Sequence, residues 1–117
     1  MEALFIVLND LSYMDEILNK FVELKIKGAT IIESQGMASA IMNQDAVFSS
    51  VLSGPFSRSL DADQKYSKTI FTVLPDNFDK ENIIGEIKKI VEDSKRHVIG
   101  FMFTLPVSGI YPLKPKQ

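Results

Sequence analysis

The chain has 117 residues, 45% of them hydrophobic, and a formal net charge of −2 at pH 7, which fits one globular domain and gives no electrostatic footprint for nucleic acid. It contains no cysteine, which excludes disulfides and thiolate metal sites. No apolar stretch reaches the roughly 18 residues of a membrane span and the N-terminus has no signal-peptide pattern, so we expect a cytoplasmic protein with no membrane span.

The first part of the chain predicts a strand, a helix and a second strand. Residues 3–8 form an almost continuous apolar run that ends at Asn9, as in a strand covered on both faces. A helix follows, because Ser12 begins a capping-box spacing and apolar residues then recur on one helical face. Gly28, after two lysines, marks the end of this helix, and residues 29–35 predict the second strand. The apolar residues of the helix are Met14, Ile17, Leu18, Phe21 and Val22.

A long connection follows, over residues 37–66. Paired strands are usually joined by about 2–5 residues, and a long connection in a small domain is commonly functional or disordered. The segment mixes apolar residues with serine-, glycine- and proline-containing turns. We therefore interpret the chain as one domain, residues 1–117, whose functional element is this insertion.

The last part of the chain repeats the strand, helix, strand pattern. Residues 68–74 predict a strand, and Asn77 or Asp79 can cap the helix that follows. Gly85 lies inside that helix, where glycine costs about 1 kcal/mol relative to alanine. Residues 99–105 predict the last strand, and the proline-containing tail after it is not expected to be regular. The apolar face of the second helix consists of Ile83, Ile84, Ile87, Ile90 and Val91.

The order βαββαβ predicts an α+β, ferredoxin-like fold. In this fold a four-stranded antiparallel sheet carries both helices on one face, and here a long loop would join strands 2 and 3. Alternation along the strands predicts two apolar faces, and helices can cover only one of them. The sequence therefore predicts an oligomer that buries the other face. One face would contain Phe5, Val7, Phe71, Val73, Phe101 and Phe103, and the other Leu4, Ile6, Leu8, Ile70, Leu74, Met102 and Leu105.

The chain resembles the PII nitrogen-regulatory proteins and their PII-like relatives. Residues 28–37 look like that family's second strand running into its long T-loop, and residues 101–107 look like its last strand with the terminal Pro-Val. The first strand and helix, and residues 69–93, match in order and spacing, so the resemblance covers the chain outside residues 37–66. It implies a signal-transduction protein in nitrogen regulation rather than an enzyme. It further implies a homotrimer that binds a small-molecule effector at intersubunit clefts and an unknown target protein through the loop of residues 38–65.

The same resemblance places the effector-binding residues. Adenine nucleotides are the usual effectors of the family, which holds their phosphates with a lysine just before the last strand and two arginines after it. Here Phe101 occupies the lysine position, and Pro112 and Lys114 stand near the arginine positions. The phosphate-binding residues are therefore largely absent, and the identity of the effector stays open. The expected binding residues are Thr30, Gly36, Met37, Lys95, Arg96 and Gly100.

No catalytic or metal-binding residue is predicted. His97 is the single histidine and has no clustered ligands around it in the sequence, and no nucleophile or phosphate-loop motif is present. Two alternatives remain open on the same superfold: a CutA-type trimer that handles metal ions, and an enzyme.

Overall fold

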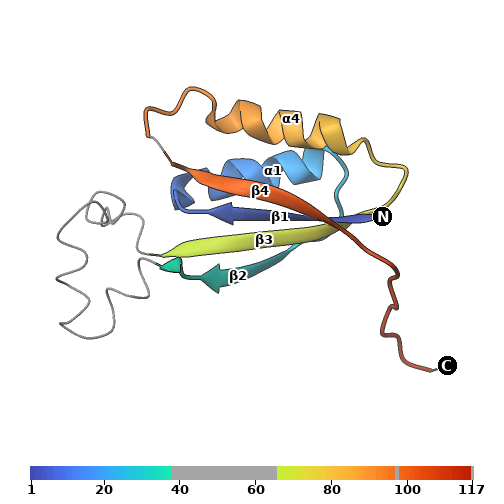
Figure 1. Ribbon diagram of the computed structural model, residues 1–117. Coiled ribbons are helices and arrows are strands. Elements are labelled where there is room, and N and C mark those ends of the chain that lie inside the picture. The colour runs from blue at the N-terminus through green and yellow to red at the C-terminus, as the bar shows by residue number, and fades with distance from the viewer. Residues whose placement is uncertain (38–65, 97, 117) are drawn as a thin grey trace, which may run out of the picture.

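The computed structural model describes residues 1–37, 66–96 and 98–116 (Figure 1). The predicted insertion therefore lies outside the described residues, apart from Met37 and Tyr66 at its two ends. The described elements are β1 (Glu2–Leu8), a 3-10 turn (Leu11–Tyr13), α1 (Met14–Glu23), β2 (Thr30–Ser34), β3 (Ser67–Leu74), α4 (Lys80–Val91) and β4 (Gly100–Pro106).

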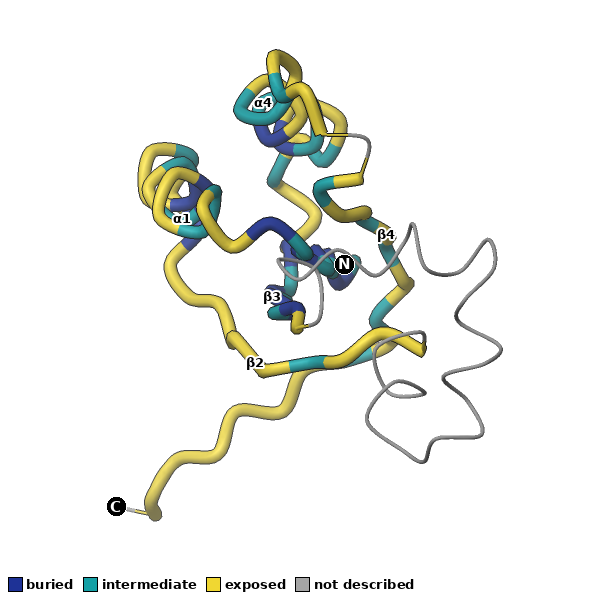
Figure 2. The backbone as a smooth tube through the Cα atoms, turned by 90° about the vertical axis from the view of Figure 1, so that its left-hand side faces the viewer, coloured by how far each residue is buried: buried dark blue, intermediate teal, exposed yellow. Residues whose placement is uncertain are grey.

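The strands form one antiparallel sheet in the order β2-β3-β1-β4. Both helices lie on the same side of this sheet (Figures 1 and 2). The α+β class, the four antiparallel strands and the two helices were all predicted, and the arrangement is compatible with a ferredoxin-like fold. The edge strands are β2 and β4, so they lie as far apart as the sheet allows.

The helix-side face of the sheet carries the core. Leu4 pairs with Thr72 and Thr104, and Ile6 pairs with Ile70 and Met102, which puts these side chains on one face. The helices cover this face with four buried side chains. The core consists of Leu4, Ile6, Leu8, Ile17, Phe21, Ile26, Ile70, Leu74, Ile83 and Ile87.

The prediction for Leu105 was wrong. Leu105 pairs with Ala3 and shares the face of Phe101 and Phe103, because residues two apart on a strand point the same way. It adds to the apolar surface that the helices leave uncovered.

Helix α1 begins and ends at other residues than predicted. Ser12 does not cap this helix; instead the Asp10 carboxylate caps the 3-10 turn before it by accepting from the Ser12 backbone N–H at 3.1 Å. The helix ends at Glu23, where Lys25 takes a left-handed conformation with φ 64° and the Ile26 N–H donates to the Phe21 carbonyl at 2.9 Å. Gly28 is therefore not the cap. Val22, predicted on the apolar face, is 75% exposed.

Helix α4 follows the prediction closely. The Asp79 side chain accepts from the Asn82 N–H at 3.2 Å, and Ile83 and Ile87 are buried. An alanine Cβ at Gly85 would meet nothing within 4 Å, so this glycine is not needed for close packing within the protomer. After β4, the Val107 N–H donates to the Met1 carbonyl at 3.1 Å, and the tail then runs away from the body without regular structure, as predicted (Figure 1).

Candidate functional site

The face of the sheet opposite the helices carries a row of stacked phenylalanines. The rings of Phe5 and Phe103 lie 4.8 Å apart and almost parallel, and Phe71 and Phe101 extend the stack at 5.5 and 6.1 Å. The stack thus crosses the three strands β3, β1 and β4. We call this surface, with Leu105 and Ile32, the aromatic face.

The aromatic face is open to solvent over β4 and β2. Phe101 is 58% exposed and Phe103 40%, with Leu105 and Ile32 both nearly half exposed. No helix or strand among the described residues covers it, since both helices lie on the other side (Figure 2). Contiguous apolar patches of this kind mark interaction surfaces in soluble proteins.

The predicted effector residues fall into two groups at opposite edges of the sheet. Thr30 begins the edge strand β2, and Gly36 and Met37 follow its end. Lys95, Arg96 and Gly100 precede or begin the other edge strand, β4. The edge strands β2 and β4 are three inter-strand spacings apart. At about 4.8 Å per spacing, the two groups lie about 14 Å apart across the sheet. One protomer therefore does not bring the two groups together around one small molecule.

Asp10 holds the turn that contains Lys95 and Arg96. Its carboxylate accepts from the Ser12 hydroxyl at 2.6 Å and lies 3.4 Å from the Arg96 guanidinium. The Ile99 carbonyl accepts from the backbone N–H groups of Asn9 and Asp10 at 2.8 and 3.1 Å. The turn is thus fastened to the end of β1 by both side chain and backbone.

The same contacts set the charge state of Asp10. The hydrogen bonds from Ser12 lower the pKa of Asp10 below its usual value against the opposing effect of burial, and the Arg96 charge lowers it further. Arg96 is therefore engaged with an ionised carboxylate. Lys95, exposed beside it, forms no ion pair within the described part of the chain.

The packing of β4 against β1 requires a glycine at position 100. A Cβ at this position would overlap the Val7 carbonyl oxygen and approach the Leu8 Cα at 3.1 Å. Only glycine lets β4 begin this close to β1. Gly36 differs, because a Cβ there would meet nothing within 4 Å and its φ is not left-handed.

A hydroxyl cluster at the end of β2 and β3 was not predicted from the sequence. The Ser34 and Ser67 hydroxyls lie 2.7 Å apart, and the Thr69 hydroxyl donates to Ser34 at 3.0 Å. Ser67 and Thr69 are buried although polar. The sequence shows that Ser67 and Thr69 lie on one face of a strand, because they are two residues apart. It does not show that Ser34 is their partner, because this depends on the register of β2 against β3. The cluster borders the two ends of the 37–66 connection.

The described residues show no metal centre. No group of three or more potential ligands among histidine, cysteine, aspartate and glutamate occurs in residues 1–37, 66–96 and 98–116. The prediction for His97 lies outside the described residues. None of the helices in these ranges is both long enough and apolar enough to cross a membrane.

Comparison with known proteins assigns no family. No protein-family model matches the chain, and no curated protein matches it significantly.

Proposed function

We propose that this chain is a PII-like regulatory protein with a ferredoxin-like protomer, which assembles as a homotrimer and binds a small effector at the clefts between subunits. The observation that carries the proposal is the aromatic face. A sheet with helices on one side and four stacked phenylalanines on the other has a second apolar surface to bury. Self-association through that face removes it from water.

A closed ring also unites the two separated groups of effector residues. In a cyclic trimer each interface is heterologous, so unlike surfaces of neighbouring subunits meet. The β2 edge with Thr30 and Gly36 can then face the β4 edge of the next copy, with Lys95 and Gly100. The two groups that lie about 14 Å apart in one protomer would border one intersubunit cleft.

The charges of this cleft favour an effector with little negative charge. Arg96 lies 3.4 Å from Asp10, which leaves Lys95 as the cation most open to a ligand. A single exposed lysine suits a monoanion or a monophosphate better than a triphosphate. Binding at the ends of the 38–65 loop would favour one arrangement of that loop and so change its affinity for a target protein in nitrogen regulation.

The assembly is tested by placing a charge on the aromatic face. Phe101→Glu should shift the protein to monomer in native mass spectrometry, because burying an unpaired carboxylate costs several kcal/mol. Val22→Glu is the matched control, since Val22 is 75% exposed on α1, away from the aromatic face. Loss of assembly in both variants, or in neither, would contradict an interface through this face.

The effector is tested by thermal shift with AMP, ADP, ATP, cyclic nucleotides and bicarbonate. A ligand that binds only the folded state raises the melting temperature. Gly36→Ala should leave the ligand-free melting temperature nearly unchanged, because its Cβ has room, while reducing the ligand-induced shift. If none of these compounds raises the melting temperature of the wild type, nucleotides and bicarbonate are excluded as effectors.

A further inference from the structure

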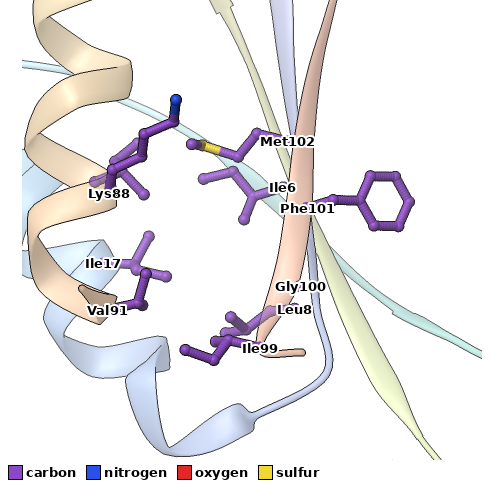
Figure 3. Close-up of a pocket in the computed structure, with 10 residues that line it drawn as sticks. Ile6, Leu8, Ile17, Lys88, Val91, Ile99, Gly100, Phe101 and Met102 are labelled. Atoms are coloured by element: carbon purple, nitrogen blue, oxygen red, sulfur yellow. The ribbon is translucent and has the colours of Figure 1, made fainter. Parts of the chain in front are cut away.

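An apolar cavity, partly open to solvent, lies between the two helices and the end of the sheet where β1 stops and β4 begins (Figure 3). Its volume is about 200 Å³. The side chains of Ile17 and Val91 enter it from the helices, and those of Ile6, Leu8, Ile99 and Met102 from the sheet side (Figure 3). The Phe101 ring points away from it, towards the aromatic face (Figure 3). The cavity is thus separate from the surface proposed for assembly.

One cation stands at the edge of this cavity. Lys88 extends from α4 along the cavity, with its amino group on the side of Met102 (Figure 3). Within the described residues no carboxylate lies within 4.0 Å of the Lys88 amino group, whereas that of Lys89 is 3.2 Å from Glu86. The neighbouring lysine is therefore paired, and the lysine at the cavity is available to an anion.

We propose that this cavity binds an unbranched aliphatic carboxylate of medium chain length, with the chain inside and the carboxylate beside Lys88. The cavity lining is apolar, so a hydrocarbon chain that enters it removes apolar surface from water. The volume is below the roughly 300–1,000 Å³ of drug-sized sites, which favours a slender chain over a ring system or a nucleotide. The carboxylate stays ionised and hydrated at the mouth, so it costs little to place there.

The proposal does not depend on the trimer, because every cavity residue comes from one protomer. A methyl-labelled methionine sample provides the direct test. Octanoate, titrated into the full-length protein, should shift the Met102 methyl resonance and leave that of Met37, which is 74% exposed, in place. Affinity should rise about fourfold per methylene from hexanoate to octanoate, as expected for burial of each added CH₂.

Two variants and one control distinguish a carboxylate-binding site from an apolar cavity with no preference for a carboxylate. Lys88→Gln should weaken octanoate binding about two- to fivefold without changing the binding of 1-octanol, as expected for an exposed ion pair. Lys89→Gln is the matched control and should leave both unchanged. Val91→Phe, which fills the cavity, should abolish the Met102 shift while the circular dichroism spectrum is retained.

The proposal is overturned if octanoate leaves the Met102 resonance unchanged. A cavity that is filled by a second copy of the chain would give this result. The proposal is overturned equally if Lys88→Gln and Lys89→Gln bind octanoate alike. Both outcomes leave the intersubunit cleft untouched, because its tests read assembly mass and nucleotide-dependent melting.

Discussion

Asp10 connects three parts of the protomer, and its replacement tests how firmly the turn before β4 is held. Its carboxylate caps the first turn before α1, accepts from the Ser12 hydroxyl and lies beside Arg96. Asp10→Ala removes all three contacts. Asp10→Asn keeps an oxygen acceptor for the Ser12 N–H and removes only the charge.

The contacts give the size of each loss. An N-cap contributes about 1 kcal/mol, and a hydrogen bond to a charged acceptor such as that from the Ser12 hydroxyl about 1.5 kcal/mol. The pair with Arg96 adds less than about 1 kcal/mol, because the Arg96 side chain is 42% exposed and screened by solvent. We expect Asp10→Ala to lower the free energy of unfolding by about 2–3 kcal/mol, and Asp10→Asn by about 1 kcal/mol.

The pH dependence follows from the direction of the pKa shift. Folding lowers the pKa of Asp10, so its ionised form stabilises the folded state. This contribution is complete above the unfolded-state pKa of about 3.9 and is lost as the pH falls through the lower folded-state value. The stability difference between wild type and Asp10→Asn should therefore shrink below about pH 4.

Urea denaturation followed by circular dichroism measures both effects, at one fixed protein concentration because assembly contributes by mass action. A loss below about 0.5 kcal/mol for Asp10→Ala would refute the cap. A difference between wild type and Asp10→Asn that is the same at pH 7 and pH 3 would refute the role of the charge.

The backbone conformation predicts the direction in which three further substitutions change the stability of the protein. Gly85→Ala should stabilise the protein by about 1 kcal/mol, seen as a higher melting temperature, because its Cβ meets nothing and alanine favours the helix. Lys25→Gly should raise the free energy of unfolding, measured by urea denaturation, by about 0.5–1 kcal/mol, because glycine adopts the left-handed φ of 64° without strain. An unchanged free energy would show that Lys25 is not strained. Gly100→Ala should cost about 1–3 kcal/mol through its overlap with the Val7 carbonyl, with Gly28→Ala, whose Cβ has room, as the thermal-denaturation control.

The sequence predicted the elements well because their apolar spacing was regular. The ends of the predicted strands 68–74 and 99–105 lie within one residue of those of β3 and β4, and Asp79, one of the two predicted candidates, caps α4. The alternation along the strands also placed the four phenylalanines of the aromatic face correctly, although it put Leu105 on the opposite face. Such signals are local, so the order of residues is sufficient to find them.

The errors occurred where tertiary contacts decide. The predicted cap was Ser12, but Asp10 caps the 3-10 turn that leads into α1, and its buried carboxylate also contacts Arg96 in the exposed turn before β4. Helix α1 ends at Glu23, before the predicted end at Gly28, because the chain turns at the left-handed Lys25 and buries Ile26 in the core. The separation of the effector residues over two sheet edges depends on the strand order, which the chain order does not state.

The mass of the wild-type assembly tests the central proposal most directly. Sedimentation equilibrium over a range of micromolar concentrations should give three times the chain mass of 13.1 kDa. Such a trimer would bury the aromatic face and bring the β2 and β4 edges of different copies together. A stable monomer over the same range would leave Thr30 and Lys95 on opposite edges of one sheet and would contradict the proposed function.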